Sequence, residues 1–161
     1  MGVDIHVKIT KYNEKTGIWE QINLYQKDEK GNFSSVSPYP FRNSELFGIL
    51  SDEHDDHFPI HTLTTWTNYD KETQEEFELA HEDFGYYGWG WFNLAEVDLY
   101  LQKHPKVRDW DYEEDDFEEN GWKNNPVKYF IDLITAYLDL ADPYWDWDGH
   151  SNIRVILWYD R

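Results

Sequence analysis

The sequence predicts one α+β domain, in which a mainly antiparallel sheet contains both terminal strands and three to four helices pack on it. Three observations lead to this fold class. Residues 3–12 alternate between apolar and polar side chains, and residues 153–159 are rich in β-branched and aromatic side chains, so both ends of the chain form strands. The segments with helical spacing lie between them. Residues 1–161 show no internal repeat and no linker, so we expect a single globular domain.

Alternation and turn composition define the predicted strands. A turn follows the first strand and leads into a returning strand, which makes an N-terminal hairpin. Because side chains two apart on a strand point to the same face, Asp4 and His6 lie together on the polar face of the first strand. If Ile153, Val155 and Leu157 point inward, Arg154 projects to that same face. The predicted strands cover residues 3–12, 18–25 and 153–159.

Helical spacing and capping residues define four helices. Ser44 can cap the first, Asn93 and Glu96 form a capping pair for the third, and Pro126 opens the fourth. The predicted helices cover residues 45–50, 71–84, 94–104 and 126–141.

Prolines, glycines and acidic residues predict the segments without regular structure. Two prolines indicate a loop over residues 27–40, and residues 52–68 lack periodicity. Three glycines interleaved with Tyr and Trp break regular structure at residues 85–90. Residues 106–124 are predicted to form an acidic loop.

Composition limits the class of protein. Nine Trp and 19% aromatic residues indicate a buried core. The absence of cysteine excludes disulfides and zinc–thiolate sites and fits a reducing cytoplasm, so the expected location is cytoplasmic. No apolar run has the length of a membrane span, and the N-terminus lacks the pattern of a signal peptide. The net charge of −19 disfavours direct binding to nucleic acid or to an anionic membrane.

Four sequence blocks occur in a fixed order: Gly-Val-Asp-Ile-His, Arg-Asn-Ser-Glu-Leu-Phe, Trp-Phe-Asn-Leu-Ala-Glu and Ile-Arg-Val-Ile-Leu-Trp-Tyr-Asp, at residues 2–6, 42–47, 91–96 and 153–160. This order resembles a family of uncharacterised proteins of tailed phages and prophages. Its members open with Gly-Cys-Asp-Ile-His and close on a strand of the Val-Arg-x-Val-Phe-Trp-Phe-Asp kind. The resemblance implies a phage origin, hence a host-cell cytoplasm, and a shared fold; it implies no activity.

The chain departs from that family at several positions. Val3 replaces the usual cysteine, so no thiol chemistry carries over. Ser44 stands where an aromatic is usual, and Gly88-Trp89-Gly90 stands where the family often has His-Ser. If that His was catalytic, this member has kept a pocket and lost a reaction.

Asp4, His6 and two arginines form the first candidate site. Arg42 and Arg154 stand out because 14 Lys and Arg face 33 Asp and Glu. A guanidinium can bind a carboxylate or phosphate as a fork, and Asp4 can orient His6 or share a divalent metal with it. The simpler alternatives are hydrogen-bonded strand residues and structural salt bridges. The predicted ligand-binding residues are Asp4, His6, Arg42, Trp89, Trp91 and Arg154.

A second candidate is a metal site at residues 54–61, which hold His54, His57 and His61 beside several acids. Borderline metals accept imidazole and carboxylate together. The spacing matches no established metal motif, and Pro59 argues against one helix that would align the three histidines. A solvated acidic loop is the competing interpretation.

A third candidate is the acidic run of residues 109–119, with eight acids among eleven residues. Such a surface can imitate nucleic acid and occupy the basic cleft of a DNA- or RNA-binding host protein. It can equally be a solvated loop whose rings pack on the core.

Three functions therefore remain open. The favoured one is a non-enzymatic phage accessory protein that captures a small, nucleotide-like ligand or blocks a host defence protein. The alternatives are a metal-dependent hydrolase or phosphoesterase that uses Asp4 and His6, and an acidic nucleic-acid mimic. The sequence lacks the motifs of four common sites: the phosphate-binding loop, the serine nucleophile elbow, the zinc-binding helix of metalloproteases and the dinucleotide fingerprint.

Overall fold

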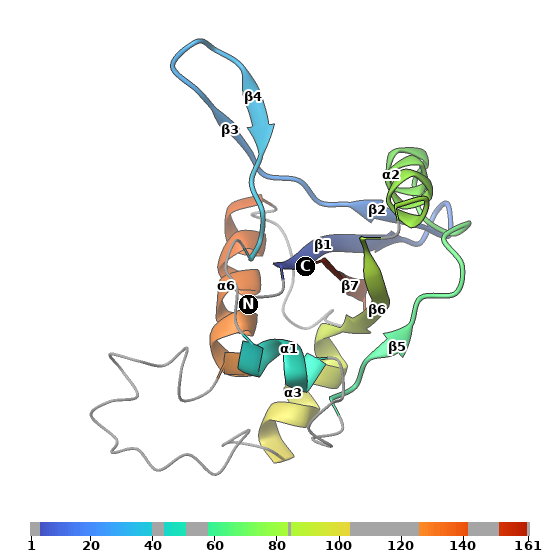
Figure 1. Ribbon diagram of the computed structural model, residues 1–161, viewed down its shortest axis with the longest axis vertical. Coiled ribbons are helices and arrows are strands. Elements are labelled where there is room, and N and C mark those ends of the chain that lie inside the picture. Colours follow the sequence, from blue (N-terminus) through green and yellow to red (C-terminus); the bar gives the residue numbers. More distant parts are fainter. Residues whose placement is uncertain are drawn as a thin grey trace.

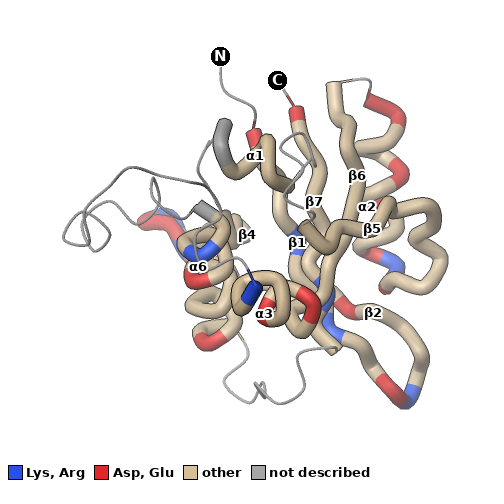
Figure 2. Tube along the Cα trace, turned by 90° about the horizontal axis from the view of Figure 1, so that it is seen from below, with Lys and Arg blue, Asp and Glu red and all other residues tan. Residues whose placement is uncertain are grey.

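A five-stranded sheet with helices on both faces forms the framework of the computed structural model (Figures 1 and 2). The structure describes residues 4–39, 44–50, 58–83, 85–103, 126–141 and 152–160. The sheet has the order β2-β1-β7-β6-β5, and each neighbouring pair is antiparallel. The two terminal strands pair directly, and β7 is the central strand. The predicted α+β fold with both terminal strands in one sheet is thus confirmed.

The helices and strands follow the chain in the order of Figure 1. The strands of the main sheet are β1 (Asp4–Asn13), β2 (Ile18–Gln21), β5 (His61–Thr62), β6 (Tyr87–Asn93) and β7 (Ile153–Asp160). A separate hairpin consists of β3 (Tyr25–Lys27) and β4 (Phe33–Ser35). The described helices are α1 (Ser44–Leu50), α2 (Lys71–His81), α3 (Leu94–Lys103) and α6 (Pro126–Ala141).

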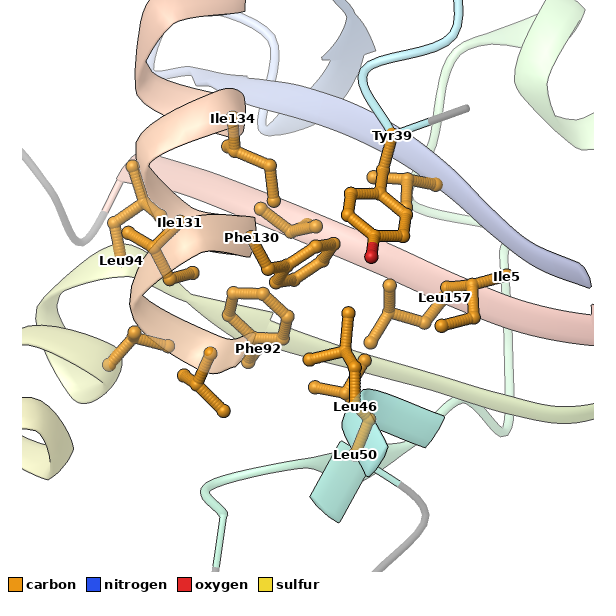
Figure 3. Close-up of a cluster of buried hydrophobic side chains, with 14 of the residues drawn as sticks. Ile5, Tyr39, Leu46, Leu50, Phe92, Leu94, Phe130, Ile131, Ile134 and Leu157 are labelled. Atoms are coloured by element: carbon orange, nitrogen blue, oxygen red, sulfur yellow. The ribbon is translucent and has the colours of Figure 1, made fainter. Parts of the chain in front are cut away.

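One face of the sheet packs against α1, α3 and α6 and carries the main core (Figures 2 and 3). Phe130 of α6 and Phe92 of β6 are fully buried there, and Leu157 comes from the central strand. Aromatic pairs in this core meet edge to face, as in Phe58 and Phe92, whose ring centroids are 5.2 Å apart. The apolar residues of α6 recur at helical spacing and form a stripe that faces the sheet. This spacing is why the helix can be predicted from the sequence.

The other face is covered by α2 and by the segment that precedes it (Figure 2). Asp70 fixes the start of α2, because its Oδ1 accepts a hydrogen bond from Thr73 N at 2.8 Å. Its Oδ2 accepts another from Gln21 N at 2.8 Å, which ties the helix to β2. Phe77 then points from α2 into a smaller core with Tyr69 and Ile156.

Two predictions of irregular structure were wrong. Residues 27–40 contain most of the β3–β4 hairpin, which stands away from the sheet (Figure 1). The glycine-containing segment 85–90 enters β6 rather than interrupting the sheet. Here a β-bulge between Tyr87 and Gly90 absorbs one extra residue, and Gly88 has φ +71°. A Cβ on Gly88 would lie 2.4 Å from Cδ2 of Tyr159, so glycine is required for both conformation and space.

The remaining local predictions are confirmed in part. Asn93 does cap α3, because its Oδ1 accepts from Glu96 N at 2.8 Å. The second strand is shorter than predicted, and β5 lies in the segment expected to be irregular. The acidic residues 106–124 are outside the described ranges. None of the helices within those ranges combines the length and apolar composition that a membrane crossing requires.

Candidate functional site: the aromatic face of the sheet

The sheet face beneath α2, which we call the aromatic face, gathers five of the nine tryptophans of the chain. They come from β2, β6, β7 and the segment before α2, and each is partly buried. Strand alternation explains the grouping, because the even-numbered residues of β1 and β7 share this face in the antiparallel register. The five are Trp19, Trp66, Trp89, Trp91 and Trp158.

A first row of stacked rings crosses the sheet from β1 to α2. His6 stacks on Trp158 with 5.4 Å between centroids, and Trp158 stacks on Trp89 at 4.6 Å. Trp89 also stacks on His81 at 3.9 Å, and His81 on Trp66 at 4.4 Å. The Nδ1 of His81 lies at hydrogen-bond distance from the carbonyl oxygen of Phe77, so this imidazole is oriented by its own helix.

A second row contains the guanidinium of Arg154. It lies over the ring of Trp91 at 3.7 Å and over the ring of Trp19 at 4.2 Å. Nη1 of Arg154 also donates a hydrogen bond to the hydroxyl oxygen of Tyr69 at 3.0 Å. Burial raises the pKa of Tyr69, while the hydrogen bond and charge of Arg154 act in the opposite direction. His61 extends the row by stacking on Trp91 at 4.3 Å.

The predicted group of Asp4, His6 and Arg154 shares the aromatic face but does not meet at one point. Arg154 is opposite Thr10, whereas His6 is opposite Trp158, four residues along β1. This offset corresponds to roughly 13 Å along the strand. His6 instead has its Nε2 3.2 Å from Oδ1 of Asp160, at ion-pair distance but outside hydrogen-bond geometry. The sequence predicts that Asp4, His6 and Arg154 interact directly or through one ligand or water. Direct contact between His6 and Arg154 is wrong, because the guanidinium lies between Trp19 and Trp91 at the far end of this offset. A link through a ligand or water stays a prediction.

Lys8 lies between these two rows and is mostly buried. Burial lowers the pKa of its ammonium to about 8, while the carboxylates of Glu72 and Asp70 act in the opposite direction. Its Nζ forms an ion pair with Glu76 of α2. Lys8 therefore anchors α2 electrostatically to the sheet at the cost of a desolvated charge.

Two hollows lined by described residues adjoin the sheet. The larger has a volume of about 500 Å³ and lies where β5, β6 and α2 approach one another. The smaller, of about 210 Å³, adjoins the edge of β1. The larger hollow is lined by Leu50, Ile60, His61, Thr62, Leu63, His81, Gly88, Trp89, Gly90 and Tyr159. The smaller is lined by His6, Val7, Lys8, Ile9, Ile22, Asn23, Ser35, Val36, Ser37, Pro38, Tyr137 and Trp158.

The other predicted site residues have different outcomes. Arg42, His54 and His57 lie outside the described residues, as does the acidic run 109–119. His61 is described: its Nε2 lies 2.7 Å from Oε2 of Glu96, across the start of α3. Within the described ranges no group of three or more His, Cys, Asp or Glu side chains is placed to hold a metal ion.

Several residues of the aromatic face were missed from the sequence. Trp158 could have been found, because the alternation that places Arg154 on this face places Trp158 there too. Trp19, Tyr69 and His81 gave no local signal, because their positions depend on how β2 and α2 dock.

No family model, no curated protein and no solved structure matches this chain. The functional argument therefore depends on the geometry of the site.

Proposed function

We propose that this protein is a non-enzymatic, phage-encoded binder that holds a small planar, nucleotide-like ligand in the larger hollow. In a phage such a protein would serve counter-defence by removing a host signal molecule. The phage role comes from the sequence resemblance, and the ligand class comes from the hollow.

The size and lining of the hollow carry this proposal. Its volume of about 500 Å³ falls within the roughly 300–1,000 Å³ that small-molecule sites occupy. Its walls combine apolar side chains with a few polar groups, namely His61, His81 and the hydroxyl of Thr62. A flat heteroaromatic ring with hydrogen-bonding edges matches such a lining.

The ring contacts define how the ligand would lie. Trp89 already stacks on Trp158 and His81, and Trp91 lies against both Arg154 and His61. A ligand in the hollow therefore meets the edge of Trp89. This arrangement favours in-plane hydrogen bonding over insertion of the ligand between two tryptophans.

The overall charge favours a ligand with few phosphates. The chain carries −19, and Glu96 holds His61 at 2.7 Å. A polyphosphate would meet long-range repulsion that only salt can screen. A nucleoside or a nucleotide with one phosphate directed to solvent avoids most of that cost.

Two arrangements in the described residues favour binding over catalysis. His81 is committed to a backbone carbonyl and His61 to Glu96, and neither lies beside an evident nucleophile. The hydrolase alternative would need Asp4 and His6, which are near Asp160 at the other end of the first row.

The test is a titration with adenosine and with adenosine 5′-monophosphate, followed through the Trp89 indole N–H by NMR. We expect a saturable shift with both, and tighter binding of the monophosphate as salt increases. Thr62→Trp should weaken binding about tenfold or more, because the new ring fills the hollow. Thr65→Trp is the matched control, since Thr65 is exposed and does not line the hollow.

Three results would contradict the proposal. They are the absence of any shift at Trp89, equal binding by the Thr62→Trp variant, and release of phosphate from the nucleotide during the titration. The last result would favour the enzymatic alternative.

A further inference from the structure

The two edges of β1 are paired to different extents. On one side β7 pairs with β1 from Asp4 to Lys11. On the other side β2 pairs with β1 only from Thr10 to Asn13. Residues 4–8 therefore have no strand on that side within the described part of the chain, even though β1 is an interior strand of the sheet.

The backbone N–H and C=O groups of Val7 point toward this open edge. Ile22 N donates a hydrogen bond to the carbonyl oxygen of Ile9 at 2.9 Å, so the polar groups of Ile9 face the β2 side. Backbone groups two residues apart on a strand point the same way, so the N–H and C=O of Val7 face that side too. If the register of β1 and β2 continued, Leu24 would be the partner of Val7.

A tyrosine of α6 prevents that pairing. The N–H of Leu24 donates to the hydroxyl oxygen of Tyr137 at 2.6 Å, and the same hydroxyl donates to the carbonyl oxygen of Ile22 at 3.3 Å. The carbonyl oxygen of Leu24 accepts from Val36 N at 2.8 Å. The chain is thereby led away from β1 into the projecting β3–β4 hairpin (Figure 1).

The smaller hollow occupies the position that a continued β2 would fill. Val7 and Tyr137 line it, together with the polar side chains of Asn23, Ser35 and Ser37. Among the described residues, none forms a hydrogen bond with the N–H or the C=O of Val7 on this side. Backbone polar groups next to a partly enclosed space need a partner, either water or another chain.

We propose that the β1 edge at Val7 is a strand-addition site, filled by an extended segment of a partner polypeptide. The partner's backbone pairs with the N–H and C=O of Val7, and one of its side chains enters the hollow. A volume of about 210 Å³ is below the roughly 300 Å³ of ordinary small-molecule sites and suits part of a peptide. Because the chain carries −19, the segment is neutral or basic. This site shares no lining residue with the larger hollow and is independent of the proposed function.

Hydrogen exchange of the free protein tests the open edge. The N–H groups of His6 and Lys8 pair with β7, whereas that of Val7 does not, so the Val7 amide should exchange about tenfold or more faster than its neighbours. Equal protection of the three amides would show that the edge is already paired and would overturn the proposal.

Peptide binding tests the occupant. The probe is acetyl-Thr-Val-Lys-Val-Thr-amide, with an analogue N-methylated at the central residue and a version with Glu in place of Lys. We expect the first probe to shift and protect the Val7 amide, and each analogue to bind about tenfold or more weakly. No change at Val7 with millimolar probe, or equal binding of the N-methylated analogue, would overturn the proposal.

Two neighbouring serines of β4 provide matched variants. Ser35→Trp places a ring in the hollow and should abolish the effect of the probe on Val7. Ser34→Trp, on the opposite face of the hairpin and outside the lining, should leave it unchanged. Both positions are exposed, so folding is preserved in both. Equal binding by the two variants would place the peptide elsewhere and overturn the proposal.

Discussion

The two faces of the same sheet are stabilised in different ways. The face beneath α1, α3 and α6 is a sealed core, where Phe92, Phe130 and Leu157 are all fully buried. On the aromatic face α2 is the covering helix among those that the structure describes, and the five tryptophans there are partly exposed. This face places a guanidinium, an ammonium and three imidazoles among those rings. Where a single helix covers a sheet, planar rings and paired charges take the place of a dry core.

The difference begins in the strands. The central strand β7 is apolar except at Arg154 and Asp160, and both of these lie on the aromatic face, as does Trp158. In β6 the bulge at Gly88 places Tyr87 beside Tyr159 on the sealed face, while Trp89 stacks on Trp158 on the aromatic face. Function is therefore expected on the aromatic face, where polar groups meet solvent, and stability on the sealed one.

The largest expected effect is the loss of stability when a core phenylalanine is truncated, compared between the two faces. Phe130→Ala should lower the free energy of unfolding by about 3–5 kcal/mol, because it leaves a cavity in a closed core. Phe77→Ala should cost less, because Trp89 and Trp158, which contact Phe77 and are only partly buried, can move into the space. Denaturant unfolding measures both. An equal or larger loss for Phe77→Ala would mean that the aromatic face is as tightly packed as the sealed one.

The next effect is the loss of stability when the glycine of the β6 bulge, Gly88, is replaced. Gly88→Ala should cost about 2–4 kcal/mol, since it adds overlap with Tyr159 to the strain of a positive φ. Gly17→Ala is the matched control, because its φ is also +71° but the nearest atom would be 3.7 Å away. Gly17→Ala should lower the free energy of unfolding only by the backbone strain, about 1–2 kcal/mol. Similar losses in thermal or denaturant unfolding would show that the clash relaxes freely.

A smaller effect depends on pH and belongs to the aromatic face alone. The pKa of Lys8 is about 8 in the folded protein and 10.5 in the unfolded chain, so the unfolded chain binds more protons between these values. The free energy of unfolding should therefore rise from pH 8 to pH 10, by about 1–2 kcal/mol. Above pH 10 the buried tyrosines oppose this, since burial raises the pKa of Tyr39 to about 12 and that of Tyr159 as well.

The check is unfolding of wild type and of Lys8→Met across pH 8 to 10. The variant should lose the rise, because it has no group with a lowered pKa at this position. A rise of equal size in both proteins would assign the pH dependence to other groups.

The smallest effect tests whether the guanidinium stack contributes beyond its charge. Arg154→Lys keeps the charge but loses the planar contact with Trp19 and Trp91, so it should cost about 1 kcal/mol. Lys27→Met is the control, because Lys27 lies over Phe33 on the exposed hairpin and should give no measurable change. If Arg154→Lys is also neutral, charge alone accounts for the role of Arg154.

The sequence alone determined the elements whose signals are local. Alternation identified β1, and β-branched and aromatic composition identified β7. Helical spacing identified α2 and α6, and Asn93 identified the start of α3. Alternation also gave the face on which Asp4, His6 and Arg154 lie. These features depend on neighbours within a few residues, which is why they could be predicted.

Only the tertiary structure decided how that face is organised. Trp19 and Trp91 enclose Arg154 because β2 and β6 dock on opposite sides of the β1–β7 pair. From the sequence, Gly88 predicts an interruption of regular structure. In the fold its positive φ instead forms a β-bulge inside β6. The hydroxyl of Tyr137 diverts Leu24 from Val7 across more than a hundred residues of chain. Such contacts have no local pattern, since they are set by the packing of distant elements rather than by the propensity of any one segment.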